Sequence, residues 1–294
     1  MTTELDRYAR WLERVCLAFV GLGVTLPIAF PTPPFAIYRD AVANAVGDAS
    51  VLDLDVARLV AGITGGSIAG KWALHWAVVR FGIRERRRWA WQATMAGLVT
   101  WFAVDSSSSL LGAAWANVVM INGLPPLLVL PLAWRLRAHC DREPAAPVSS
   151  EAPVARLSIA TAAIGVVSGL AIAFGTSSPL FDAWWVGLSS AQLHGASVPD
   201  ATRALVRFFA GPIGGSTAGH CVMLALVARH GIAASAPWAA RWSAVSVLVW
   251  VLTDSAWSFA SNGAFNVWLV NVPCAVMLLT PLAWAATRRR GAAS

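Results

Sequence analysis

Residues 58–83 read RLVAGITGGSIAGKWALHWAVVRFGI, and residues 207–232 read RFFAGPIGGSTAGHCVMLALVARHGI. The two stretches align without a gap at an offset of 149 residues, and they share a run of glycines, an Ala-Gly pair and the final Gly-Ile. Each is apolar over about 20 residues, the length that a helix needs to cross the hydrocarbon core of a bilayer. The pair therefore predicts one membrane-spanning helix that occurs twice.

The similarity extends over residues 58–122 and 207–271, where 21 of the 65 aligned pairs are identical. The motif PLAW also occurs at 131–134 and again at 281–284, one residue further along. Shared apolar composition does not explain matched Asp, Asn and Trp residues at fixed spacing. These matches predict two tandem copies of one unit, with these pairs: Asp105 and Asp254, Asn117 and Asn266, Asn122 and Asn271, Trp101 and Trp250.

The amino-acid composition is typical of a membrane protein. Of its 294 residues 57% are hydrophobic and 13% are charged, whereas soluble domains carry about 25% charged residues. The first apolar run lacks the small-residue cleavage site of a signal peptide, so we interpret it as a retained span. The sequence predicts an all-α membrane protein of about eight transmembrane helices, at residues 15–30, 59–79, 89–110, 115–134, 157–174, 204–228, 238–260 and 264–284.

The predicted units are organised as parallel repeats. Because each has about four spans, both enter and leave the membrane on the same face, and a pseudo-twofold axis along the membrane normal relates them. The first four-helix repeat covers 1–142, a cytoplasmic linker rich in Pro, Ala and Ser covers 143–153, and the second four-helix repeat covers 154–294. The connections at 38–57 and 182–202 are expected to hold short amphipathic helices at the outer interface.

The charge distribution predicts the orientation. A net charge of +7 would suggest nucleic acid in a soluble protein, but the basic residues lie at span ends and no nucleic-acid-binding motif accompanies them. The arginines gather on the side that holds both termini, which the positive-inside rule places in the cytoplasm. The Arg- and Ala-rich, Lys-poor composition favours a bacterial inner membrane, with the lipid bilayer as the partner.

No sequence motif indicates a particular reaction or cofactor. The four cysteines are isolated, without the spacing of a disulfide framework or a metal site. Phosphate-binding, zinc-protease and serine-hydrolase motifs are absent. A haem held by His75 and His220, or a retinal on Lys71, has nothing in the spacing that supports it. We therefore expect no metal and no cofactor.

Glycines four residues apart follow one face of the repeated helix. Such a face lets another backbone approach closely, so we expect tight helix packing, with a surface that lines a substrate path as the alternative. The residues are Gly62, Gly66 and Gly70 in the first copy and Gly211, Gly215 and Gly219 in the second.

Polar residues at membrane depth are the candidates for a site. Lys71 is the only lysine in the chain, it lies near the middle of its span, and His220 occupies the matching position. Ionisable groups inside a membrane are costly, and they commonly mark substrate or proton pathways. The predicted substrate or proton site comprises Lys71, Asp105, Asn117, Asn122, His220, Asp254, Asn266 and Asn271. The structural alternative is a set of interhelical hydrogen bonds with one buried ion pair, in which Lys71 pairs with Asp105 or Asp254.

Three classes of function follow from these features. The first is transport or permeation of a small solute or proton through the polar intramembrane site. The second is a non-catalytic membrane subunit or scaffold, whose polar residues only hold the helices together. The third is an integral-membrane enzyme that acts on a lipophilic ligand, such as a lipid or isoprenoid, with a buried Asp as general acid.

Overall fold

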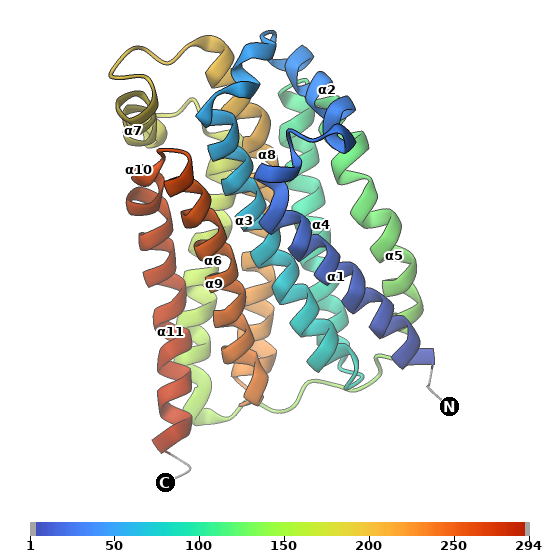
Figure 1. Ribbon diagram of the computed structural model, residues 1–294. Helices are drawn as coiled ribbons and strands as arrows, with labels where there is room; N and C mark the ends of the chain where they lie inside the picture. Colours follow the sequence, from blue (N-terminus) through green and yellow to red (C-terminus); the bar gives the residue numbers. More distant parts are fainter. Residues whose placement is uncertain (1–3, 292–294) are drawn as a thin grey trace.

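The computed structural model describes residues 4–291, and over this part the chain is helical, as the composition predicts. The ends of the two predicted repeats, residues 1–3 and 292–294, lie outside the described residues. Figure 1 shows a bundle of long helices in which the first helix begins and the last helix ends at the same end. Six described helices are long and apolar enough to cross a membrane, which indicates an integral membrane protein.

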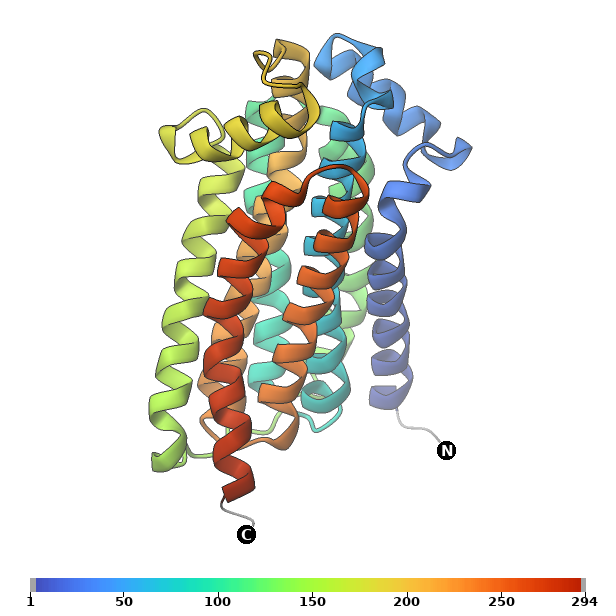
Figure 2. The ribbon, with the colours of Figure 1, turned by 60° about the vertical axis from the view of Figure 1, so that its left-hand side comes forward.

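The long helices run roughly along the bundle. They are α1 (Glu4–Ala29), α3 (Asp55–Val78), α4 (Arg88–Leu111), α5 (Leu124–Arg137), α6 (Ala152–Phe174), α8 (Asp200–Val227), α9 (Pro237–Ala260) and α11 (Val272–Gly291). At the end away from the termini lie α2 (Ala36–Val46) and α7 (Asp182–Gln192), next to the 3-10 turns η1 (Pro33–Phe35), η2 (Ala49–Asp53) and η6 (Pro179–Phe181) (Figure 2). The prediction of a short helix in each of these two connections is confirmed.

Four π-helical segments interrupt the α-helices at corresponding places. They are η3 (Val79–Ile83), η7 (Ala228–Ile232), η4 (Asn117–Asn122) and η8 (Val267–Asn271), the last preceded by the one-turn α10 (Ala264–Asn266). Left-handed backbone also recurs at the offset of 149 residues, with φ of 64° at Arg86 and 55° at Ser235, and 55° at Ala113 and 53° at Asn262. Segments of π-helix are rare and often lie at functional sites.

The two most buried helices, α3 and α8, lie side by side in the middle of the bundle. The main partners of α3 are α1 and α9, and those of α8 are α6 and α4. By contrast, α3 has little contact with α4, and α8 has little contact with α9, although each pair is consecutive in the chain. Helices from the two halves of the sequence therefore interleave.

Two of the predicted spans, α3 and α4, are not among the six helices that meet the length and hydropathy criteria. Each has 24 residues, which extend about 36 Å at 1.5 Å per residue, enough to cross a bilayer. Their sequences are less apolar because α3 carries glycines with Lys71 and His75, and α4 carries a run of serines after Asp105. The prediction of eight spans stays a prediction.

The glycine faces of α3 and α8 lie at close helix crossings. A Cβ added at Gly66 would lie 2.8 Å from Cβ of Asp254, and one at Gly215 would lie 2.8 Å from Cβ of Asp105. The other four predicted glycines are similarly crowded: Gly62 by Trp257, Gly70 by Trp250, Gly211 by Asp105 and Gly219 by Gly97. The absence of side chains lets α9 approach α3, and α4 approach α8, with the two aspartates at the crossings.

Candidate functional site

Each of the two aspartates accepts two side-chain hydrogen bonds of the same kind. Oδ1 of Asp105 accepts from Nδ2 of Asn117 at 2.8 Å and from Oγ of Ser109 at 3.1 Å. Oδ1 of Asp254 accepts at 2.9 Å and 3.0 Å from the matching donors, Asn266 and Ser258. These bonds tie each aspartate to its own helix and to the start of the π-helical segment that follows.

The other two predicted amides bind serines at the far end of the same segments. Asn122 donates to Oγ of Ser106 at 3.1 Å, and Asn271 donates to Oγ of Ser255 at 3.1 Å. Each π-helical segment is therefore held to the preceding helix by its last asparagine and by a second asparagine, which is the first residue of η4 (Asn117) or directly precedes η8 (Asn266). Hydrogen bonds of this kind satisfy polar side chains that a bilayer core does not solvate.

The helices across the end of the bundle reach into both clusters. The hydroxyl of Tyr38, in α2, donates to Oδ1 of Asn117 at 3.2 Å. Nε1 of Trp184, in α7, donates to Oδ1 of Asn266 at 3.1 Å. We call these groups the first cluster (Asp105, Ser109, Asn117, Tyr38) and the second cluster (Asp254, Ser258, Asn266, Trp184).

Both carboxylates are buried, and in each the hydrogen bonds described above end on Oδ1. Asp105 is 0% exposed and Asp254 is 1% exposed. Oδ2 of Asp105 is fully buried and has no hydrogen-bond partner. A buried polar atom without a partner costs about 1–3 kcal/mol, so the first cluster has a free acceptor in the interior.

Lys71 forms no ion pair with either carboxylate. Its side chain is fully buried, and Nζ lies 4.0 Å from the ring centroid of Trp101 and 4.3 Å from that of Trp72. Nζ has no hydrogen-bond partner, and no ion pair joins it to a described carboxylate. The structure therefore does not form the expected ion pair with Asp105 or Asp254, because the amine stands over two indole rings instead.

The two histidines of the central helices are oriented by hydrogen bonds. Ser246 Oγ donates its single hydrogen to the carbonyl of Ser243 at 2.8 Å, so at 3.0 Å it accepts from Nε2 of His220. Nδ1 of His75 donates to the carbonyl of Lys71 at 3.0 Å, and its Nε2 has no partner. Lys71 and His75 thus present two unpartnered nitrogens one turn apart on α3.

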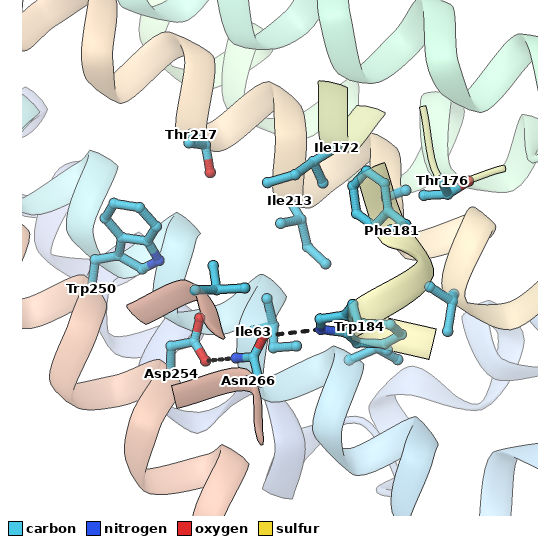
Figure 3. Close-up of a pocket in the computed structure, with 14 residues that line it drawn as sticks. Ile63, Ile172, Thr176, Phe181, Trp184, Ile213, Thr217, Trp250, Asp254 and Asn266 are labelled. Atoms are coloured by element: carbon cyan, nitrogen blue, oxygen red, sulfur yellow. Dashed lines mark hydrogen bonds between the residues drawn. The ribbon is translucent and has the colours of Figure 1, made fainter. Parts of the chain in front are cut away.

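A small cavity adjoins the second cluster, and Figure 3 shows Asp254 and Asn266 at its edge with Trp184 and Trp250 on either side. Its volume is about 70 Å³, room for roughly two water molecules at ~30 Å³ each. A larger hollow of about 330 Å³ lies between α6 and α11. The two share Ile172, Phe181, Trp184, Thr217, Trp250 and Val270, and so adjoin.

The larger hollow falls within the range of small-molecule sites, about 300–1,000 Å³. Among the described residues no group of three or more His, Cys, Asp or Glu is placed to hold a metal ion. The site thus offers buried carboxylates, amides and an amine, with an apolar hollow next to one of the carboxylates.

The sequence did not identify several members of these clusters. Ser109 and Ser258 are themselves a matched pair at the offset of 149 residues, which was a usable signal. Tyr38 and Trp184 lie before the aligned stretches and are 146 residues apart. Because this offset differs from 149 residues, the alignment did not pair Tyr38 with Trp184.

Comparison with protein-family models, with curated proteins and with solved structures finds no match to this chain. The function is therefore argued from the site.

Proposed function

We propose that this chain is an eight-span membrane protein of two parallel four-helix repeats, which moves a small solute or protons across the membrane through the polar interior of the bundle. The eight spans are the six apolar helices together with α3, which its neighbours largely bury, and α4, which exposes Val99 and Phe102 on its outer face. Residues 143–153 link the repeats. By the positive-inside rule both termini are cytoplasmic, in a bacterial inner membrane.

Three kinds of observation support the repeats. The π-helical segments and the left-handed turn residues recur at an offset of 149 residues. The hydrogen bonds of Asp105 recur at Asp254 with the same partner types. The first helix begins and the last helix ends at the same end of the bundle, as an even number of spans requires (Figure 1).

The transport proposal rests on the surroundings of the buried Lys71 amine. A charged amine at membrane depth costs at least about 2.5 kcal/mol, and Lys71 has two ring faces but no hydrogen bond or ion pair to offset that cost. Ring faces contribute about 2 kcal/mol in a desolvated site. The amine therefore suits a group that exchanges a proton or binds a passing anion.

Asp105 is placed to take part in the same exchange. It lies four residues from Trp101 on α4, so both side chains are on one face of the helix, a turn apart. Trp101 contacts the Lys71 amine, and Asp105 has a buried carboxylate oxygen without a hydrogen-bond partner. The proposed path for a proton or solute runs from the Lys71 amine to this carboxylate.

Proteoliposomes test the proposal. Protein is reconstituted into vesicles that contain a pH-sensitive dye, and a potassium diffusion potential drives protons inward. We expect flux above that of empty vesicles, and a loss of at least about tenfold in Lys71→Met and Asp105→Asn, because each removes a titratable group. Asp48→Asn, at an exposed position, is the control. Flux that is equal in all four proteins contradicts the assignment of Lys71 and Asp105.

A second candidate function, a non-catalytic subunit or scaffold, is favoured by the second cluster. Oδ1 of Asp254 accepts two hydrogen bonds, and their donors fasten the π-helical segment to α9. Hydrogen bonds of this kind are sufficient for a cluster whose only role is to hold helices together. Under this alternative, substitutions in either cluster change thermal stability and no flux is measured for the wild-type protein.

A further inference from the structure

One difference between the two halves of the bundle lies where an outer helix packs on a central helix. In the first half, Phe19 of α1 stacks on Trp72 of α3, with 4.6 Å between ring centroids and 19° between planes. In the second half, the residues that face each other at this place are Gly165 of α6 and Cys221 of α8. Two large rings are thus replaced by the smallest residue and a thiol.

The correspondence is set by the helix crossings next to these positions. A Cβ added at Gly65 would collide with the carbonyl of Gly23, and one at Gly214 would collide with the carbonyl of Gly169. Phe19 lies four residues before Gly23, and Gly165 lies four residues before Gly169. One helical turn from matching crossings, two stacked rings lie between the helices of the first half, whereas Gly165 and Cys221 are in close contact in the second half.

Gly165 and Cys221 both line the hollow of about 330 Å³. It lies between α6 and α11, which stand next to each other at the edge of the bundle (Figure 2). In the most apolar stretch of each of these helices, 28% of the residues are buried. If the bundle spans a membrane, the hollow opens sideways toward the lipid tails.

The side chains that line the hollow and the adjoining cavity indicate which kind of molecule would bind there. Phe181, Trp184 and Trp250 present aromatic rings, and ring faces attract cations. Asp254 lines the small cavity that adjoins the hollow, and a buried carboxylate is stabilised by a positive partner. No lysine or arginine is among the described residues that line either space.

We propose that a lipophilic organic cation, an ammonium group on an apolar body, enters from the membrane between α6 and α11 and places its charge near Asp254 and the Trp184 and Trp250 rings. The apolar body fills the hollow between α6 and α11, beside Gly165 and Cys221. This inference goes beyond the proposed function, because binding at this place stands whether or not the cation is carried across the membrane.

Binding of radiolabelled hexyltrimethylammonium to the full-length protein in lipid nanodiscs tests the inference. We expect saturable binding that unlabelled cation displaces. The neutral isostere 2,2-dimethyloctane and the anion hexanesulfonate are expected to compete at least about tenfold less well, because neither offers a positive charge to the carboxylate and rings. Equal competition by the neutral isostere, or no saturable binding, overturns the proposal.

Two variants locate the binding. Asp254→Asn keeps an oxygen for Asn266 and Ser258 but removes the charge, so we expect affinity to fall at least about tenfold. Cys221→Trp introduces the residue type of the first half and is expected to abolish binding. Should that variant fail to fold, Cys221→Leu fills part of the hollow and is expected to weaken binding. The exposed Asp48→Asn is the matched control, and affinities equal to its own in Asp254→Asn overturn the proposal.

Discussion

The indole rings of Trp89 and Trp238 lie nearly parallel, with 5.9 Å between ring centroids and 5° between planes. They are a matched pair at the offset of 149 residues, one in the first turn of α4 and the other in the first turn of α9. The stack joins the two helices that each pack against a central helix of the opposite half. Neither half therefore encloses its own core.

Chains cut in the linker at residues 143–153 are expected to assemble only together. The most extensive packing of α4 is on α8, and that of α9 is on α3, so each half alone exposes the faces that the other covers. Co-expressed halves should co-purify through a tag on one of them, whereas each half expressed singly should aggregate. A single half that is monodisperse and folded by circular dichroism would contradict the interleaved packing.

Substitution at a glycine crossing is expected to destabilise the bundle. In Gly66→Ala the new Cβ lies 2.8 Å from both N and Cβ of Asp254, so the helices must separate, at a cost of about 1–3 kcal/mol. Gly21→Ala on α1 is the control, because a Cβ there meets nothing within 4 Å. The melting temperature in detergent should fall for Gly66→Ala and stay equal or rise for Gly21→Ala.

Two substitutions at Asp105 separate its structural role from its proposed role in flux. Asp105→Ala removes the acceptor of Asn117 and Ser109, and we expect a loss of about 1–3 kcal/mol in the free energy of unfolding. Asp105→Asn keeps an acceptor oxygen and should be nearly as stable as the wild type. Both should lose proton flux in proteoliposomes. Normal flux in a stable Asp105→Asn protein would leave Asp105 with a structural role alone.

Substitutions at Lys71 are expected to show that its amine is not needed for stability. Lys71→Met retains a chain that fills the space against Trp72 and Trp101, and it removes a charge without a hydrogen-bond partner. Its melting temperature should equal or exceed that of the wild type. Lys71→Ala leaves a cavity and should cost about 2–5 kcal/mol. Equal destabilisation by both would show that the amine has a partner.

The thiol of Cys140, which follows α5, is expected to react slowly at neutral pH. Burial raises its pKa to about 11, with Asp141 adding to the shift and Arg86 opposing it. Because the thiolate is the nucleophile, alkylation by N-ethylmaleimide at pH 7.5 should be roughly a hundredfold slower than at an exposed thiol, and it should accelerate as pH rises toward 11. Ala138→Cys, at an exposed position two residues away, provides the reference rate in the same segment, measured by peptide mass spectrometry.

Much of the helical framework was predictable because it depends on local composition. A run of about 20 apolar residues forms a helix in a membrane, since only internal hydrogen bonds satisfy its backbone there. The spacing of Gly62, Gly66 and Gly70 likewise predicts a flat face from one helix alone. The pairing of Asp105 with Asn117, and of Asp254 with Asn266, was suggested by their recurrence together at one offset.

The sequence by itself therefore determined the helical membrane class, the positions of most helices and the residues that recur in both halves, because periodicity and composition act within one helix. Only the tertiary structure decided that α4 packs on α8 and α9 on α3, and that Lys71 meets two indole rings and no carboxylate. It alone decided that a hollow opens beside Gly165 and Cys221. Each of these depends on which helix lies next to which, and one-dimensional spacing does not contain that information.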